Sequence, residues 1–229
     1  KMFEEQIDCL AADMPAKVIK IGLLASINNI QILVKKLAEF KANWDVPPFV
    51  IYDPVAVAST GDEMMEVGCL DIIKTALFPL VDLLTPNAKE VITLSGHALI
   101  SGESLKPAAE KLISMGCKSV LIKGGHFPLI DKISLDYWTD GKREIALASP
   151  RLENVQTHGS GCTLSSAIAA TLADNYFIED ALVIAKAYLN QGLKASKKMG
   201  QGEGAVAHCG WPACIDDFPE VVLPESPIG

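Results

Sequence analysis

Residues 48–55, PFVIYDPV, are an apolar run that ends in a carboxylate, and they indicate the architecture of the chain. Three other short runs are almost continuously apolar: 18–24 (VIKIGLL), 81–86 (VDLLTP) and 119–123 (SVLIK). Such runs are typical of strands that are covered on both faces. Helix-length segments with apolar residues three and four apart lie between them, at 27–43, 63–78 and 104–116. This alternation predicts an α/β fold with a parallel sheet and helices on both sides.

The second half of the chain begins with a hairpin signal. Two strand-like runs, 136–139 and 143–152, flank Asp140-Gly141-Lys142, and Asp-Gly between such runs favours a hairpin. We expect this hairpin to close one edge of the sheet. Two helices are predicted after it, at 161–174 and 178–199.

The composition indicates a cytoplasmic protein. Of the 229 residues, 49% are hydrophobic, yet no apolar run is long enough for a membrane span and the first residues lack the layout of a signal peptide. The formal net charge of −8 argues against a nucleic-acid partner. We expect reduced thiols for most of the six cysteines, and plain thiols rather than a metal clip with His208 for the last two. The six are Cys9, Cys69, Cys117, Cys162, Cys209 and Cys214.

Polar and small residues follow the predicted strands. Asp53 follows FVIY, Asn87 follows DLLTP, and Lys123 follows SVLI with two glycines after it. Because the carboxyl ends of parallel strands form the ligand crevice of such sheets, we expect these residues to meet there. Lys123 would offer a point cation suited to a polyphosphate.

The stretch THGSGCTLSSAIAA at 157–170 places two glycines just before a helix. Gly159, Ser160 and Gly161 have little side chain, so their backbone N–H groups and the positive end of the helix dipole predict an anion site. The alternative is a tight strand-to-helix turn with no ligand. Cys162 is placed at the first helical position, where the dipole would lower its pKa and make it a base or nucleophile, although a small buried hydrophobe is the commoner role.

Two further pairs of interpretations stay open. Asn87 and Glu90 lie three residues apart at a helix start, and they could hold a hydrated Mg²⁺ or simply cap the helix. Asp53 before Pro54 could form a turn, but its place at a strand end favours a functional carboxylate. Neither the P-loop motif nor G-x-G-x-x-G occurs, which argues against a P-loop ATPase and a dinucleotide oxidoreductase. No histidine is assigned a catalytic role.

Five stretches together resemble the hydroxymethylpyrimidine/phosphomethylpyrimidine kinases of thiamine biosynthesis, within the ribokinase-like superfamily. These are KIGLLA (20–25), YDPVAVASTGD (52–62), LLTPNAKE (83–90), VLIKGGH (120–126) and THGSGCTLSSAIAA (157–170). The resemblance implies a three-layer α/β/α domain with a mainly parallel central sheet. It also implies ATP- and Mg²⁺-dependent phosphorylation of 4-amino-5-hydroxymethyl-2-methylpyrimidine and then of its monophosphate to the diphosphate.

The resemblance also implies roles for individual residues. Gly159, Ser160 and Gly161 match the family's anion hole, and Cys162 matches the base that acts on the substrate hydroxyl. Lys123 matches the lysine on the ATP phosphates, and Asp53 matches the carboxylate near the reacting groups. Asn87 and Glu90 match the pair associated with magnesium, while Leu23 and Val55 fall where the family lines the pyrimidine pocket.

Both ends of the chain depart from the family pattern. The sequence starts at a helix well inside the family's domain, so the amino-terminal part of the fold is missing from residues 1–208, the expected kinase domain. Residues 209–229 form a proline-rich tail that we expect to lack regular structure, as a linker to a second thiamine-pathway enzyme or an unstructured extension. The family's tendency to dimerise implies a homodimer. A pyridoxal kinase of the same superfamily and a catalytically silent pyrimidine-binding module are the competing interpretations.

Overall fold

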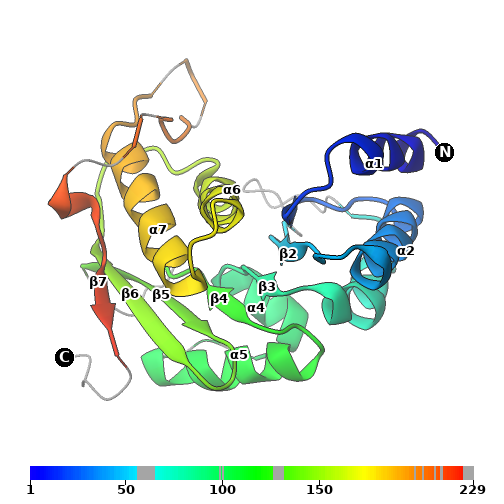
Figure 1. Ribbon diagram of the computed structural model, residues 1–229. Coiled ribbons are helices and arrows are strands. Elements are labelled where there is room, and N and C mark those ends of the chain that lie inside the picture. The colour runs from blue at the N-terminus through cyan, green and yellow to red at the C-terminus, as the bar shows by residue number, and fades with distance from the viewer. Residues whose placement is uncertain are drawn as a thin grey trace.

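A computed structural model describes residues 1–55, 65–97, 99, 101–125, 132–198, 200–202, 204–208, 210–211 and 214–223. Its strands form one sheet in chain order (Figure 1). The strands are β1 (Val18–Ile21), β2 (Phe49–Tyr52), β3 (Leu83–Leu84), β4 (Val120–Ile122), β5 (Ile133–Thr139), β6 (Glu144–Pro150) and β7 (Glu220–Val222). Neighbours from β1 to β4 are parallel, and neighbours from β4 to β7 are antiparallel. The sheet is therefore mixed, and its parallel strands β1 to β4 lie in the four apolar runs predicted to be strands.

The helices fall close to their predicted ranges. They are α1 (Met2–Asp13), α2 (Ile27–Asn43), α3 (Cys69–Ile72), α4 (Ala88–Ser95), α5 (Leu105–Ser114), α6 (Ser160–Ala173) and α7 (Ile178–Lys194), with short turns η1 (Ile73–Leu77), η2 (Phe78–Leu80), η3 (Gly102–Ser104) and η4 (Ile215–Asp217). The helix predicted at 27–43 has the same bounds in the structure. In the described part of the 63–78 prediction, the helix begins at Cys69 and continues through η1 and η2. None of the described helices is long and apolar enough to cross a membrane.

Two apolar cores lie on opposite faces of the sheet, and they explain why the run at residues 48–52 is apolar at every position. Val50 and Tyr52 pack in the core formed with α2, α3, α4 and α5, whereas Ile51 between them packs in the core formed with α6 and α7. Successive side chains of a strand point to opposite faces, so a strand buried on both faces is apolar at every position. Figure 1 shows α6 and α7 on one side of the sheet and α4 and α5 on the other.

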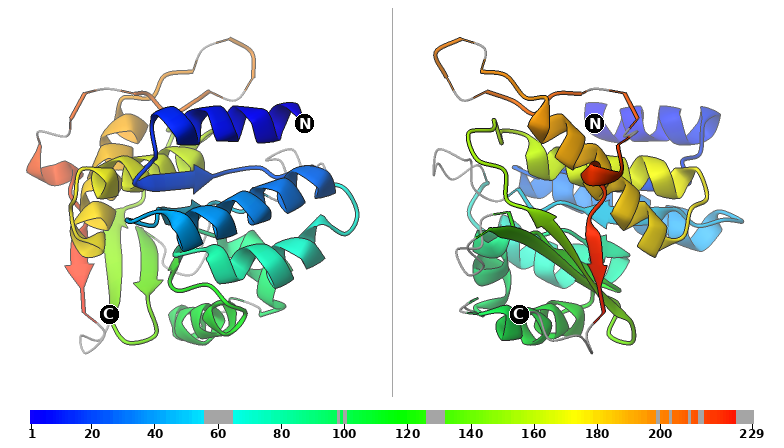
Figure 2. Two further views of the ribbon diagram at one scale, coloured as in Figure 1. Left: turned by 45° about the vertical axis from the view of Figure 1, so that its right-hand side comes forward. Right: turned by 90° about the vertical axis from the view of Figure 1, so that its left-hand side faces the viewer.

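The hairpin prediction is confirmed, but the prediction about the sheet edge is wrong. Residues 140–143 connect β5 to β6, and the two strands pair in register from Ile133↔Pro150 to Thr139↔Glu144. β6 is not the edge, because β7 pairs with it through Ala146↔Val222, Leu147↔Val221 and Ala148↔Glu220 (Figure 2).

The tail therefore has regular structure at residues 215–217 and 220–222, contrary to the expectation from its prolines. Pro219 lies just before the strand, and Pro212, Pro224 and Pro227 lie outside the described residues. A proline in front of an edge strand removes no ladder hydrogen bond, so it does not prevent pairing.

Candidate active site

Asp53 is the centre of a polar cluster at the carboxyl end of the parallel strands. It has no exposed surface, and its Oδ1 accepts hydrogen bonds from Lys123 Nζ at 2.6 Å and Thr85 Oγ1 at 3.3 Å. Its Oδ2 accepts a hydrogen bond from Ser165 Oγ at 3.0 Å and lies 3.9 Å from Lys20 Nζ. A fully buried carboxylate needs such partners, because leaving its charge unpaired away from water costs several kcal/mol, on the order of 3–5. The predicted meeting of Asp53 and Lys123 is confirmed, whereas the contacts of Ser165 and Lys20 were not predicted.

The loops after β3 and β4 bring Lys123 to the start of α4. The backbone N–H of Lys123 donates to the Pro86 carbonyl at 2.9 Å, and Asn87 and Lys123 form an isolated parallel bridge. Lys123 Nζ lies 3.9 Å from Glu90 Oε2 in addition to its close contact with Asp53. Its side chain is 12% exposed, so the ammonium stands between two carboxylates at the border of the buried region.

Gly159, Ser160 and Gly161, called here the glycine turn, lie at the start of α6, and the anion site predicted there stays a prediction. Gly159 is the N-cap of α6 with φ at +82°, a left-handed conformation that strongly favours glycine. The N–H groups of the first turn have no acceptor within a helix, so those of Gly161 and Cys162 face outward at the positive end of the dipole. A Cβ at Gly161 would lie 3.1 Å from Lys123 Nζ, so a bare backbone here lets the lysine approach the helix terminus.

Asn87 and Glu90 form a complete capping box at the start of α4. Asn87 Oδ1 accepts from the Glu90 N–H at 3.0 Å, and Glu90 Oε2 accepts from the Asn87 N–H at 2.7 Å. Burial raises the pKa of Glu90 to about 7, against the opposing effects of Lys123 and the Asn87 N–H. The capping interpretation is therefore confirmed. The magnesium interpretation stays a prediction, and the described residues contain no cluster of three or more His, Cys, Asp or Glu side chains that could hold a metal ion.

The prediction that the helix dipole lowers the Cys162 pKa is wrong. Cys162 is the third residue of α6 rather than the first, and the residue is exposed. Partial withdrawal of its thiol from water and the negative charge of Asp53 raise the pKa of Cys162, while Lys20 and Lys123 act in the opposite direction. The sequence could not show this, because Asp53 comes from a strand more than a hundred residues away in the chain.

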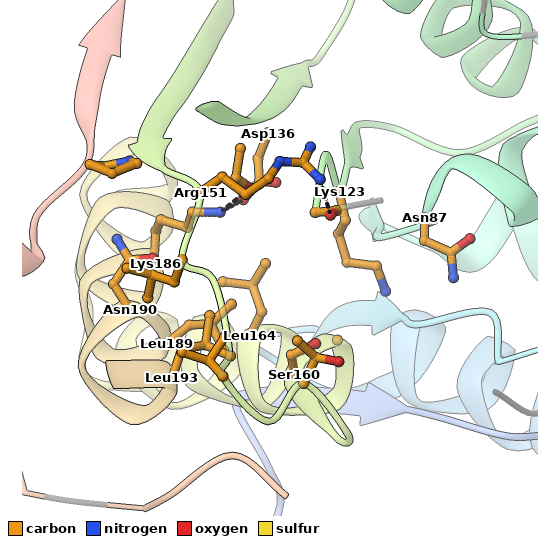
Figure 3. A pocket seen from close by; sticks show the side chains of 17 residues that line it. Asn87, Lys123, Asp136, Arg151, Ser160, Leu164, Lys186, Leu189, Asn190 and Leu193 are labelled. Atoms are coloured by element: carbon orange, nitrogen blue, oxygen red, sulfur yellow. Dashed lines mark hydrogen bonds and ion pairs between the residues drawn. The ribbon is translucent and has the colours of Figure 1, made fainter. Parts of the chain in front are cut away.

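A cavity of about 190 Å³ opens beside this cluster, between the β5–β6 hairpin and helices α6 and α7 (Figure 3). Lys123, Ser160 and Gly161 line one end of it. Leu189 and Leu193 on α7 line the other end, as Figure 3 shows. The cavity therefore has a cationic end at the glycine turn, and its other end, called here the apolar end, is lined by Leu189 and Leu193 together with Asn190 and the ion-paired Lys186.

An ion pair that was not predicted from the sequence lines this cavity. Lys186 Nζ contacts Asp136 Oδ2 at 2.6 Å, and the two side chains are only 5% and 2% exposed. Asp136 Oδ1 also accepts the N–H of Gly124 at 2.7 Å, so it holds the loop that follows Lys123. The available signal was Lys186 itself, a lysine on the apolar face of the helix between Leu182 and Leu189.

The remaining candidates lie at other positions. Leu23 and Val55 lie in the loops after β1 and β2, where Leu23 is 40% exposed and Val55 is half-buried. Their role in a pyrimidine pocket stays a prediction. His126 and Cys209 lie outside the described residues, and Nδ1 of His208 is 3.2 Å from the Tyr188 hydroxyl. The five described cysteines are all free thiols.

The fold is that of the ribokinase-like small-molecule kinases. A pyridoxal kinase from Staphylococcus aureus, solved in complex with AMP-PCP, matches with a TM-score of 0.80 and 30% identity over 96% of this chain and 77% of that one. A phosphomethylpyrimidine kinase from Clostridium difficile matches with a TM-score of 0.68 and 28% identity over 82% of this chain and 74% of that one.

The family model described as phosphomethylpyrimidine kinase matches residues 1–207, and the chain belongs to this family. It is 37% identical over 199 residues to a hydroxymethylpyrimidine/phosphomethylpyrimidine kinase from Streptomyces coelicolor, covering 87% of this chain and 70% of that protein. It is 36% identical over 204 residues to the thiamine biosynthesis bifunctional protein ThiED from Geobacter sulfurreducens, covering 89% of this chain. The chain spans 40% of the length of that bifunctional relative.

Proposed function

We propose that this protein transfers phosphate from ATP to 4-amino-5-hydroxymethyl-2-methylpyrimidine and then to the resulting monophosphate. The observation that carries the proposal is the Lys123–Asp53 contact of 2.6 Å beside the glycine turn, at the cationic end of the cavity. Membership of the phosphomethylpyrimidine kinase family and the likeness to a kinase structure holding an ATP analogue support it.

The charged and apolar groups of the site have different proposed roles. Phosphoryl transfer through a loose transition state needs positioning and charge neutralisation more than strong base catalysis. Lys123 and the N–H groups of Gly161 and Cys162 would neutralise the transferring phosphate, because the Ser160 N–H already donates to the Thr157 carbonyl at 3.0 Å. Asp53 would hold the Lys123 ammonium in place and orient the reacting groups. Leu23 and Val55 would contact the pyrimidine.

Cys162 is proposed as the base for the first step. Its raised pKa makes the thiolate the minor form at neutral pH, and only this form would accept the hydroxymethyl proton, as the oxygen bonds to the γ-phosphorus and the bond to ADP breaks. The second step needs no base, because its nucleophile is an already ionised phosphate. One site can therefore serve both reactions.

Magnesium is proposed as the partner of ATP, and the chemistry of Glu90 fits it. Mg²⁺ is commonly bound by one or two carboxylates together with substrate phosphates and water. The capping box uses one carboxylate oxygen of Glu90, which leaves the other for a cation, and a divalent charge would offset the burial that raises the Glu90 pKa. Asn87 would support this site by fixing the Glu90 backbone and carboxylate. When bound, Mg²⁺ would neutralise charge on the ATP phosphates.

The competing function is pyridoxal kinase activity, which the likeness to the Staphylococcus aureus pyridoxal kinase favours. The test is phosphate transfer from ATP by the full-length protein to the pyrimidine alcohol, its monophosphate and pyridoxal. We expect two successive phosphate additions to the pyrimidine. A clear preference for pyridoxal, or no second phosphorylation, would contradict the proposal, and absence of any ATP consumption would favour a silent binding module.

The location of the protein, its fusion to another enzyme and its oligomeric state are inferred from the same family. We infer a cytoplasmic location, with which five free thiols in the described residues agree. Fusion to a second thiamine-pathway enzyme remains a proposal, motivated by the bifunctional relative from Geobacter sulfurreducens. A homodimer also remains a proposal, and sedimentation of the full-length protein tests it.

A further inference from the structure

The segment Cys214–Leu223, called here the carboxyl-terminal strap, packs against the domain although it lies beyond residue 207, where the family match ends. Its strand β7 pairs with β6, and Asp217 in its 3₁₀ turn is only 5% exposed. Figure 2 shows this segment, drawn in red, along the outer side of α7 and the edge of the sheet. The strap is therefore part of the folded domain.

The strap makes direct contact with a side chain that lines the cavity. The backbone carbonyl of Asp217 accepts a hydrogen bond from Asn190 Nδ2 at 2.8 Å. Ser149 Oγ on β6 accepts a second hydrogen bond from the same Nδ2 at 3.0 Å. The Asp217 carboxylate also accepts from Lys194 Nζ at 2.6 Å, one helical turn further along α7. An amide nitrogen carries two hydrogens, and both are now committed. The orientation of the Asn190 amide is therefore fixed by groups outside the cavity.

The fixed amide leaves its oxygen as a hydrogen-bond acceptor. Asn190 is 7% exposed and stands on α7 beside Leu189 and Leu193, at the apolar end of the cavity (Figure 3). The nearby Asp136 carboxylate is already occupied by Lys186 and by the Gly124 N–H. The apolar end of the cavity thus presents the Asn190 oxygen as an acceptor that has no hydrogen-bond partner among the described residues.

We propose that Asn190 selects the base of the nucleotide by accepting a hydrogen bond from an amino group on the ring, and that the strap positions Asn190 for this contact. The inference rests on the proposed function, because it assumes that phosphates occupy the cationic end and the base the apolar end. It predicts a preference for a 6-aminopurine over a 6-oxopurine. The carbonyl of a 6-oxopurine would face the Asn190 oxygen and leave two acceptors without a donor.

The test compares ATP with ITP, which differ at this ring position, in direct binding and in phosphate transfer. We expect the full-length protein to bind ATP at least about tenfold more tightly than ITP, the scale of one hydrogen bond. Asn190→Leu removes the acceptor at similar volume and should bring the two affinities to within about twofold. If the ratio of the ATP affinity to the ITP affinity is unchanged in this variant, Asn190 does not select the base.

A second variant tests the strap while leaving every cavity side chain in place. Asp217→Ala removes the partner of Lys194 and loosens the turn whose carbonyl holds Asn190. The ratio of the ATP affinity to the ITP affinity should therefore fall about two- to fivefold, with little change in kcat. Lys106→Met, which breaks the exposed 3.1 Å pair between Lys106 and Glu144, is the matched control and should keep the ratio. Equal ratios in Asp217→Ala and the control would overturn the positioning role of the strap.

The outcomes separate this inference from the proposed function. If the pyrimidine is phosphorylated but Asn190→Leu keeps the nucleotide preference, the inference fails and the function stands. If Asn190→Leu changes nucleotide binding but no pyrimidine is phosphorylated, the function fails and the inference stands. If the full-length protein binds neither nucleotide, both fail.

Discussion

Asp53 and Lys123 depend on each other at the centre of the site. The carboxylate has no exposed surface, and Lys123 supplies its shortest contact, whereas Lys20 is more than an ångström further away at 3.9 Å. A charge buried in this way is retained only with a partner. The pair therefore fixes the position of the ammonium that the proposed reaction requires.

Replacing Lys123 with methionine should abolish most of the activity in both phosphorylation steps. The variant removes the cation at the glycine turn while keeping most of the length of the side chain, and loss of such a preorganised charge typically costs about 10²-fold or more in kcat. Steady-state rates with the pyrimidine alcohol and with its monophosphate measure the effect. Lys106→Met, on an exposed lysine of α5, is the control. Turnover within about threefold of the unmodified protein would remove Lys123 from the mechanism.

Cys162→Ala should slow the first phosphorylation more than the second. The proposed base is needed only for the hydroxymethyl group, so we expect about a 10²-fold loss in the first step and a change of less than about threefold in the second. Single-turnover rates with each substrate measure the two steps separately. Equal losses in both steps would exclude Cys162 as the base and leave it a packing role.

The raised pKa of Cys162 has a consequence of its own for alkylation. The thiolate is the reactive form, and partial withdrawal of the thiol from water together with the charge of Asp53 keeps it scarce at neutral pH. Iodoacetamide should therefore label Cys162 slowly at pH 7 and faster as the pH rises toward 9, a trend that mass spectrometry of the modified peptide follows. Cys9 and Cys214, which are also exposed, serve as internal references. If Cys162 is labelled faster than both references at pH 7, its thiol is activated and the direction of the shift is wrong.

At the scale of elements, the close approach of β4 and β5 restricts the loop that carries Lys123. A Cβ added at Gly124 would lie 1.7 Å from the carbonyl oxygen of Leu135, which is backbone and cannot rotate away. By contrast, a Cβ at Gly125 would meet nothing within 4 Å. The two neighbouring glycines therefore have different reasons to be present.

Gly124→Ala should destabilise the protein and displace Lys123, whereas Gly125→Ala should do neither. Forcing the end of β4 away from β5 also stretches the hydrogen bond from Gly124 to Asp136, so we expect a loss of at least about 2 kcal/mol in the free energy of unfolding. Urea denaturation of the two variants measures the difference. Equal stability of Gly124→Ala and Gly125→Ala would show that β5 can move to make room.

The same elements show which features of the fold could be predicted from the sequence. The helix at 27–43 and the Asp140-Gly141 hairpin depend on local periodicity and turn chemistry, and both are found as predicted. The pair between Lys186 and Asp136 joins residues 50 positions apart, and the pairing of β7 with β6 is equally non-local. No local pattern encodes such contacts. The Cys162 prediction failed for the same reason, because Asp53 changes its pKa from another element.

For the whole molecule, the main difference between the prediction from the sequence and the structure concerns the carboxyl-terminal tail. Its prolines suggested a linker, yet Phe218 is buried and Pro219 is half-buried. Lys194 donates to the Asp216 carbonyl at 3.0 Å as well as to the Asp217 carboxylate. Lys194 belongs to α7 and β7 pairs with β6, so the strap joins the sheet edge to α7.

Deleting residues 214–229 should therefore destabilise the whole domain, whereas deleting only residues 224–229 should not. The longer deletion removes a strand, exposes part of β6, and leaves the Asn190 amide and Lys194 without their strap partners. Loss of this half-buried apolar surface and of two hydrogen bonds predicts a decrease of about 2–4 kcal/mol in the free energy of unfolding. Chemical denaturation of both truncations measures it, at equal protein concentration. If both deletions unfold at the denaturant concentration of the full-length protein, the tail is a linker and β7 adds nothing to the stability of the sheet.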